Sequence, residues 1–509
     1  MKSSLALFAE PHLAIARRLL WLSTWLLWIP MAVYIGILNH NQSLGILQGA
    51  LLVVSLIGLV VINAETAVVI YSCRRSNPWF NRGLLQRWAG VKRKRRRRPV
   101  ALVRPALALV RSPTGESQPS VSVPFVSVPF VSVIVAAYLP NEQDIIEDTL
   151  LHWLTQVTPP AQGWEVILAY NTPLPLPVED RLQVLARRYP ALVLLPVAHS
   201  HSKAENLNAA LQIAAGEMTG IFDADHHPAA DCLSRAWAWL YQGRYDMVQG
   251  RNIIRNAQDS WLTQLIAVEF ECIYGVSHYG RSLLADTALF GGSNGYWRTA
   301  ALRPLGFHHT RLTEDIDVTI RGLLAGCRLV HDPAIVTTEL APDNLRGLWL
   351  QRQRWSQGWL EIAGLHLGTV LKSPHFDSAQ KPYWALMLLF SQGFYLLVWQ
   401  VVPMLLSIYL SRSSRDLNFE NLNLVLMGLL TLSVMLQVAV AMGLRPADST
   451  YTRRHGVLYC LLSPTYFWLK ALIGMVAVVN HCSGSRVWHV TARTKSKPNR
   501  WMVTLRGVK

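Results

Sequence analysis

The sequence predicts an α/β domain with a mostly parallel sheet, inserted between N-terminal and C-terminal transmembrane helices. Three observations lead to this fold class. Apolar residues make up 51% of the 509-residue chain and charged residues only 16%, whereas soluble domains average about 25% charged residues. Long apolar runs lie near both ends. Between them, from residue 131 to about 340, strand-like runs alternate with helical stretches, a pattern typical of parallel sheets with crossover helices.

Residues 1–65 are expected to form a transmembrane hairpin. The apolar runs Leu20–Leu38 and Leu44–Asn63 each approach the ~20 residues that cross a bilayer. A cleaved signal peptide is the alternative, but the first run is too long and has no clear small-residue cleavage site.

A basic linker rich in Pro, Ser and Val follows over residues 66–130, with VSVPF repeated in tandem near its end. Its run Lys92–Arg98 reads KRKRRRR, and such a run marks the cytoplasmic side of a membrane. Because it follows two apolar runs, anionic lipid headgroups are its expected partner. The net charge of +17 also suits nucleic acid, but no aromatic-basic groove supports that class, and we expect no nucleic acid partner.

Residues 131–343 are expected to form the α/β domain, in the cytoplasm. Its strand-like runs are VSVIVAAY, WEVILAY, ALVLLPV and MTGIFDAD, and its clearest helical stretches are Asn141–Trp153 and Ala204–Ala215. Sheets of this kind bind ligands at the carboxyl ends of their strands, so polar residues that directly follow these runs are the candidates for a site.

Arg, Trp and Leu dominate residues 344–382, and this composition predicts amphipathic interfacial helices. Apolar runs then return within residues 383–480, at 384–410, 422–444 and 457–480, before a basic tail at 481–509. Three crossings would place that tail outside, against the positive-inside rule. Either one run is re-entrant (Ser463-Pro464 interrupts the last), or the first run contains two crossings, or the tail is an exception.

Three short motifs carry chemistry. Asp223 and Asp225 end a strand-like run, and such a pair can share Mg²⁺ or Mn²⁺, although a lone DxD is more often a turn cap.

Asp315 in a TED triplet suits a general base, although Thr313 could equally be the N-cap of a helix that begins there. Gln351, Arg354 and Trp355 share one helical face. The Arg could bind a diphosphate with two hydrogen bonds and the indole could stack on a sugar. The alternative is that the Arg and the Trp only anchor the helix at the membrane interface.

In this order and at these separations, DAD, TED and QxxRW between terminal apolar runs resemble the membrane-integrated synthases of glycosyltransferase family 2. That family includes cellulose, hyaluronan, poly-N-acetylglucosamine and curdlan synthase-like enzymes. The resemblance implies a GT-A fold and inverting transfer from a UDP-sugar. It makes Asp315 the catalytic base and Asp225, with Asp223, the metal site. It also implies an integral membrane protein, in a bacterial inner or plasma membrane.

Further residues are placed by the same resemblance. On the donor side it places Tyr138, Glu142, Lys203, Asn208, Asp223, Gln351 and Arg354, and on the acceptor side Phe290, Gly291, Gly292, Ser293, Asn294, Glu314 and Trp355. The family usually ends its second strand with an Asp that holds uracil, whereas Asn171 stands there in this chain. An amide offers a different set of donors and acceptors, and this departure bears on the identity of the nucleobase.

The expected function is transfer of a sugar, glucose or N-acetylglucosamine, to a growing β-linked polysaccharide that the membrane helices export. An accessory subunit is an optional partner. The second hypothesis is a glycolipid synthase that adds one sugar to diacylglycerol or ceramide. The third is a non-catalytic sugar-nucleotide sensor or scaffold, against which the presence of Asp225, Asp315 and Arg354 speaks.

Overall fold

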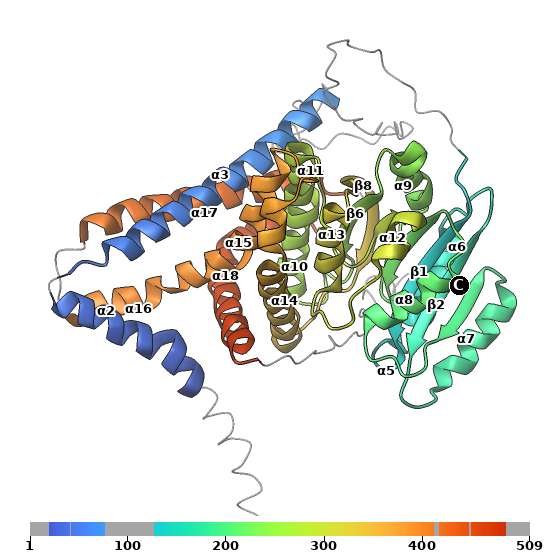
Figure 1. The fold of residues 1–509 in the computed structure, drawn as a ribbon, viewed down its shortest axis with the longest axis horizontal. Helices are drawn as coiled ribbons and strands as arrows, with labels where there is room; N and C mark the ends of the chain where they lie inside the picture. Colours follow the sequence, from blue (N-terminus) through green and yellow to red (C-terminus); the bar gives the residue numbers. More distant parts are fainter. Residues whose placement is uncertain (1–19, 41, 77–126, 412–416, 447–448, 485–509) are drawn as a thin grey trace, which may run out of the picture.

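A computed structural model describes residues 20–40, 42–76, 127–411, 417–446 and 449–484. The basic run at 92–98, the first of the two VSVPF copies and most of the basic tail lie outside these residues. Helices gather at one side of the molecule and the sheet with its covering helices at the other (Figure 1).

The N-terminal apolar runs form a helical hairpin. η1 (Thr24–Trp28) leads into α2 (Ile29–Asn39), and α3 (Gly45–Ser76) returns toward the sheet domain. The second helix continues past residue 65, where the sequence suggested the linker would begin. Val68, Val69 and Ile70 near its end pack against the helices that cover the domain.

Eight strands form one sheet in the order β3-β2-β1-β4-β7-β6-β8-β5. Their bounds are β1 Val131–Tyr138, β2 Trp164–Asn171, β3 Leu192–Pro196, β4 Met218–Asp223, β5 His227–Pro228, β6 Met247–Ile254, β7 Gly295–Arg298 and β8 Leu329–Glu339. The four strand-like runs of the sequence are therefore strands β1 to β4, and these pair in parallel. The sheet as a whole is mixed, because β7 pairs antiparallel with both β4 and β6, and β5 with β8.

Helices cover both faces of the sheet. They are α5 Leu139–Glu142, α6 Ile146–Gln156, α7 Pro177–Arg188, α8 Lys203–Ile213, α9 Cys232–Leu240, η2 Tyr241–Gly243, α12 Thr299–Leu305 and α13 Glu314–Leu324. Alternation along β1 explains this arrangement, because Val133 and Val135 face one apolar core while Ile134 faces a second. Both cores lack solvent exposure, which is why the strands read as continuous apolar runs.

A helical stretch between β6 and β7 connects the domain to the terminal helices. It consists of α10 (Trp261–Cys272), the π-helical turn η3 (Ile273–Ser277) and α11 (His278–Ala285). Apolar side chains of α10 share a core with the domain-side ends of α3 and α17 (Leu417–Leu444) and with α18 (Arg453–Cys482). The sequence did not single out this stretch, although it joins the two parts of the molecule.

The C-terminal helices are α14 (Leu345–Lys372), α15 (Gln380–Trp399), α16 (Val401–Ser411), α17 (Leu417–Leu444) and α18 (Arg453–Cys482). The run at 384–410 is interrupted at Gln400. The cause is Pro403, because the ring of a proline clashes with the carbonyl four residues earlier, here that of residue 399. By contrast, α18 continues through Pro464 without interruption. Five helices in the described residues are long and apolar enough to cross a membrane: 20–39, 45–74, 393–411, 425–444 and 453–482.

Candidate functional site

A cavity of about 800 Å³ opens where β1, β2 and β4 end, since Tyr138, Asn171 and Asp223 all line it. Loops after the parallel strands meet there with the starts of α8, α13 and α14. Fourteen of the seventeen residues singled out in the sequence line this cavity: Tyr138, Glu142, Asn171, Lys203, Asp223, Asp225, Gly291, Gly292, Ser293, Glu314, Asp315, Gln351, Arg354 and Trp355.

The acidic pair lies at the end of β4. Ligating atoms of Asp223, Asp225 and His226 all lie within 4.8 Å of one another. Asp225 is buried, and its Oδ2 accepts a hydrogen bond from the Leu340 amide at 2.9 Å. A pair of carboxylates open to a cavity suits a hard divalent cation, which prefers oxygen ligands, so the residues present fit such an ion.

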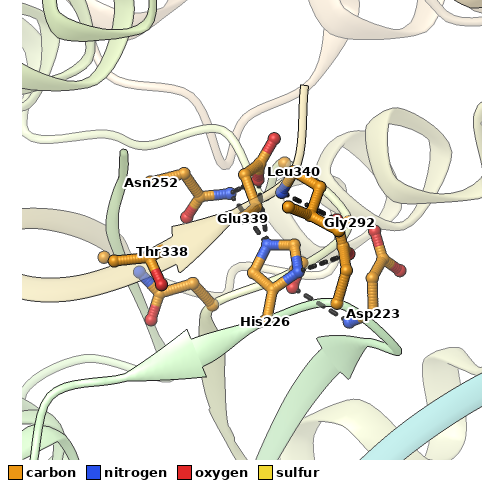
Figure 2. A network of polar contacts seen from close by, with 12 residues as sticks. Asp223, His226, Asn252, Gly292, Thr338, Glu339 and Leu340 are labelled. Carbon is orange, nitrogen blue, oxygen red and sulfur yellow. Dashed lines mark hydrogen bonds and ion pairs between the residues drawn. The ribbon is translucent and has the colours of Figure 1, made fainter. Parts of the chain in front are cut away.

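A buried polar network supports the acidic pair (Figure 2). His226 contacts Asp225 through Nδ1 at 3.1 Å and Glu339 through Nε2 at 2.9 Å. Asn252 donates to Glu339 at 2.8 Å. Burial alone would lower the pKa of His226, but the two carboxylates raise it to about 9. Since both ring nitrogens are engaged, His226 orients Asp225 in this structure rather than offering a free ligand atom.

Lys203 begins α8 and extends into the cavity between the acidic motifs. Its ammonium pairs with Asp223, lies 3.8 Å from Glu314 and donates to the Gly292 carbonyl at 2.7 Å. Burial opposes its charge, yet Asp223 and Glu314 raise the pKa of Lys203. It is therefore a permanent cation at neutral pH, placed where an anionic ligand would enter.

Asp315 lies in the first turn of α13, beside the glycine loop. The loop can come this close because Gly292 has φ +81° and no side chain, and a Cβ there would lie 2.8 Å from Asp315 Oδ2. Burial and the neighbouring Glu314 raise the pKa of Asp315 to about 7. Thr313 is the N-cap by position, but its side chain does not cap the helix, so the triplet is not explained by capping.

Gln351, Arg354 and Trp355 lie on α14 and all line the cavity. Arg354 donates to the Leu312 carbonyl at 3.0 Å, just before the TED triplet. Gln351 Oε1 is buried and has no hydrogen-bond partner among the described residues. Gly358 on the same helix allows this approach, because a Cβ there would overlap the side chain of Thr313.

The other end of the cavity surrounds Asn171 at the end of β2. Its Nδ2 donates to the Ser200 carbonyl at 2.9 Å, and its Oδ1 accepts from Asn206 at 2.8 Å. The orientation of the amide is thereby fixed. Glu142 accepts a 2.6 Å hydrogen bond from the backbone of Tyr138, and Leu139 and Pro140 begin the short helix α5.

Three residues that the sequence placed in the site do not line the cavity. Asn208 exchanges two hydrogen bonds with the backbone of Phe307, at 2.7 and 2.8 Å. Phe290 is fully buried in the core. Asn294 is also buried and donates to the carbonyls of Arg251 and Ile335. In this structure these three side chains hold the glycine loop and α8 in place.

The cavity-lining residues that the sequence motifs did not reveal include Asn252, Phe270, Tyr274 and Glu339. Asn252 is on β6 and Glu339 ends β8, while Phe270 and Tyr274 belong to α10 and η3. Only the π-helical turn is a local feature that often accompanies functional sites, and it is not readable from side-chain periodicity. The other three are brought in by sheet order and helix packing.

Two family models match the chain. The model described as glycosyl transferase family 2 matches residues 132–303, and that of glycosyl transferase family group 2 matches residues 220–444. The first covers the strands up to β7, and the second runs from the acidic pair through α17.

Curated relatives match part of the chain. A poly-beta-1,6-N-acetyl-D-glucosamine synthase of Staphylococcus aureus (strain MSSA476) is 25% identical over 245 residues, covering 48% of this chain and 58% of that protein. Glucomannan 4-beta-mannosyltransferase 7 of Arabidopsis thaliana is 28% identical over 170 residues, 33% of this chain and 30% of that protein. The match thus spans little more than half the length of the first relative and less of the second.

Among solved structures, a mannosyltransferase from Pyrobaculum calidifontis in complex with GDP-Man and Mn²⁺ is 19% identical, with a TM-score of 0.49 over 84% of this chain and 100% of that chain. The two family models overlap over residues 220–303 and together span the residues that line the cavity. We conclude that the chain carries glycosyl transferase family 2 domains, within residues 132–303 by one model and 220–444 by the family-group model.

Proposed function

We propose that this protein is a membrane-bound inverting glycosyltransferase that moves a sugar from a nucleotide sugar, a UDP-sugar first of all, to a growing β-linked polysaccharide. The observation that carries the proposal is that one cavity brings together an acidic pair, two cations, a buried carboxylate and an indole from four separate segments. Each of these groups has a place in a single displacement at an anomeric carbon.

The donor would lie across the strand ends, with its base near Asn171. Asp223 and Asp225 would hold Mg²⁺ or Mn²⁺, which when bound supplies positive charge to the leaving diphosphate. Lys203 and Arg354 line the same cavity and would bind the phosphate oxygens directly, Arg354 with two parallel hydrogen bonds. Gln351, whose buried oxygen lacks a partner among the described residues, would donate or accept at the donor sugar.

Asp315 would act as the general base. It takes the proton from an acceptor hydroxyl as that oxygen bonds the anomeric carbon and the bond from this carbon to the diphosphate breaks. A base works best when its pKa lies near the operating pH, and burial raises the pKa of Asp315 to about 7. One displacement inverts the anomeric centre, which makes a β-linkage from an α-linked donor.

The acceptor would lie over Trp355, in the part of the cavity lined by Phe270 and Tyr274. Aromatic faces suit the apolar C–H face of a sugar. The names of the relatives, a poly-N-acetylglucosamine synthase and a glucomannan mannosyltransferase, favour a polysaccharide acceptor. They also make N-acetylglucosamine the first sugar to test and add mannose to the glucose suggested by the sequence.

The five apolar helices support a place in a membrane, with the sheet domain on the cytoplasmic side. The domain-side ends of α3 and α17 share an apolar core with α10, whereas the opposite ends of α2, α3 and α16 form a separate cluster. The hairpins therefore run away from the domain, as they would from a cytoplasmic domain into a bilayer. Anionic lipid headgroups remain the proposed partner of the basic linker.

The test is a donor panel. Purified protein with Mg²⁺ or Mn²⁺ is incubated with labelled UDP-N-acetylglucosamine, UDP-glucose and GDP-mannose, with and without added lipid, beside an Asp315→Asn control. The proposal requires that the wild-type protein transfers sugar from at least one of these donors and that the Asp315→Asn control does not. Binding of a donor without release of nucleotide would favour the non-catalytic sensor, and neither binding nor release would contradict the proposal.

A further inference from the structure

Trp355, the indole proposed to carry the acceptor, is held on one face by a second side chain of its own helix. The Arg352 guanidinium lies 4.2 Å from the centre of the Trp355 ring. Arg352 is only 7% exposed, whereas Trp355 is half-buried and lines the cavity. A planar guanidinium stacked on an indole restricts the tilt of the ring, and it leaves the opposite face for a ligand.

Arg352 is in turn held by Glu269 on α10, with 2.6 Å between Nη2 and Oε2. Glu269 is 5% exposed. Burial alone would raise the pKa of Glu269, but Arg352 and Lys470 hold it at about 2. The carboxylate is therefore charged at every pH at which the protein would work, and the pair with Arg352 is permanent.

The same carboxylate receives two further hydrogen bonds from α18. The Tyr466 hydroxyl donates at 2.8 Å to Oε2, and the Lys470 ammonium donates at 3.0 Å to Oε1. Glu269 thus joins three helices, α10, α14 and α18, which also lie together in Figure 1.

Lys470 lies well inside the apolar helix 453–482, one of the five that could cross a membrane. A charged side chain among apolar neighbours is costly unless it is paired, and the Lys470 ammonium lies 3.0 Å from Glu269 Oε1. Lys470 pairs with Glu269, and Glu269 pairs with Arg352. Arg352 in turn stacks on Trp355, so Lys470 is linked to the proposed acceptor site.

We propose that Glu269 is a positioning residue for the acceptor: through Arg352 it sets the plane of Trp355, and through Tyr466 and Lys470 it makes α18 part of the acceptor site. Donor binding does not depend on this cluster, because the proposed donor groups Lys203, Asp223 and Arg354 have other partners. The inference rests on the proposed function, since Trp355 is a platform only if a sugar is transferred.

Two variants test it, Tyr466→Phe and Glu269→Gln. Tyr466→Phe removes one hydrogen bond and keeps the ring, so it should fold. The matched control is Tyr459→Phe, since the Tyr459 ring lies 6.1 Å from that of Tyr466 on the same helix and, among the described residues, only Tyr466 of the two bonds to Glu269. The acceptor probes are β-1,4- and β-1,6-linked N-acetylglucosamine tetramers, used with the donor that the wild-type protein accepts.

For Tyr466→Phe we expect the KM for the tetramer to rise about fivefold. Loss of a hydrogen bond to a charged group costs about tenfold or more where it acts directly, and Tyr466 acts on Trp355 only through Glu269 and Arg352. Glu269→Gln should raise it further. The Kd for UDP and the kcat at saturating tetramer should stay near the wild-type values, and Tyr459→Phe should match the wild type. Lost structure alone would instead lower kcat and weaken UDP binding together.

An unchanged KM for the tetramer in both variants, with folding and UDP binding intact, would overturn the inference and leave the proposed function standing. Equal rises in the KM for tetramer and in the Kd for UDP would also overturn it, because the cluster would then support the whole fold. A wild-type protein that transfers from no donor contradicts the proposed function itself, which is a separate outcome.

Discussion

At Asp315, burial and the charge of Glu314 act against ionisation, while Lys203 and Arg354 favour it, and the pKa settles at about 7. A base must be ionised to accept a proton, so activity should be present above this pKa and should fall as the pH drops through about 7. The measurement is the pH profile of kcat/KM, whose acidic limb should lie near neutrality. A limb near pH 4, the range of an ordinary carboxyl group, would assign the base to another residue.

Glu339 provides a second test at a single residue. Glu339 contacts His226, and His226 contacts Asp225. The substitution Glu339→Gln should therefore let the side chain of Asp225, the proposed metal ligand, rotate. Loss of such support weakens metal affinity about 10- to 100-fold. Electron paramagnetic resonance of Mn²⁺ binding, without any donor, measures this directly.

The control for that measurement is Glu179→Gln on α7, a partly buried carboxylate that does not line the cavity. It should bind Mn²⁺ like the wild type. Equal Mn²⁺ affinity in the Glu339 variant and in the wild type would mean that the buried network supports the fold and not the metal site.

At the scale of elements, α14 packs closely against the TED triplet, since Gly358 lies next to the side chain of Thr313. Gly358→Ala would push a methyl group into Thr313, and overpacking of this kind costs about 1–3 kcal/mol. Gly364→Ala is the matched control on the same helix, since Gly364 is exposed and has open space around it. It should gain up to about 1 kcal/mol from helix propensity.

Thermal unfolding in detergent compares the two glycine variants. The midpoint should fall for Gly358→Ala and rise slightly for Gly364→Ala. A similar rise for both would show that α14 does not need close contact with Thr313.

The sequence predicted those features that depend on residues close together in the chain. The parallel strands β1 to β4 coincide with apolar runs, and Gln351, Arg354 and Trp355 share a face because helical spacing requires it. Contacts between segments that are distant in the sequence had no such signal in the local pattern of residues. The antiparallel insertion of β7, the burial of Phe290 and Asn294, and the entry of Tyr274 into the cavity all depend on sheet order and on how α10 packs.

Over the whole molecule, the path of α18 bears on the basic tail. Near its start Gly456 packs against Met442 at the domain-side end of α17. Near its end Met475 and Val476 pack with Leu26, in the first turns of the N-terminal helix. Figure 1 shows α18 beside α14 rather than along α3 and α17. We propose that α18 lies along the membrane face rather than across it, which would agree with the positive-inside rule for the basic tail.

Cys482, which is exposed at the end of α18, tests this topology. A membrane-impermeant maleimide should fail to label it in intact cells and should label it after permeabilisation. His40→Cys, in the exposed turn between α2 and α3, should be labelled in intact cells. Labelling of Cys482 from outside would mean that α18 crosses the membrane.

The central claim is that the cavity extends a polysaccharide, and the size of the product tests it most directly. Wild-type protein and Asp315→Asn would be given the accepted donor in labelled form, and the products would be separated by mass and by organic extraction. We expect high-mass, water-soluble product from the wild type and at least about a hundredfold less from the variant. A single labelled lipid in the organic phase, with no high-mass product, would contradict it and identify a glycolipid synthase.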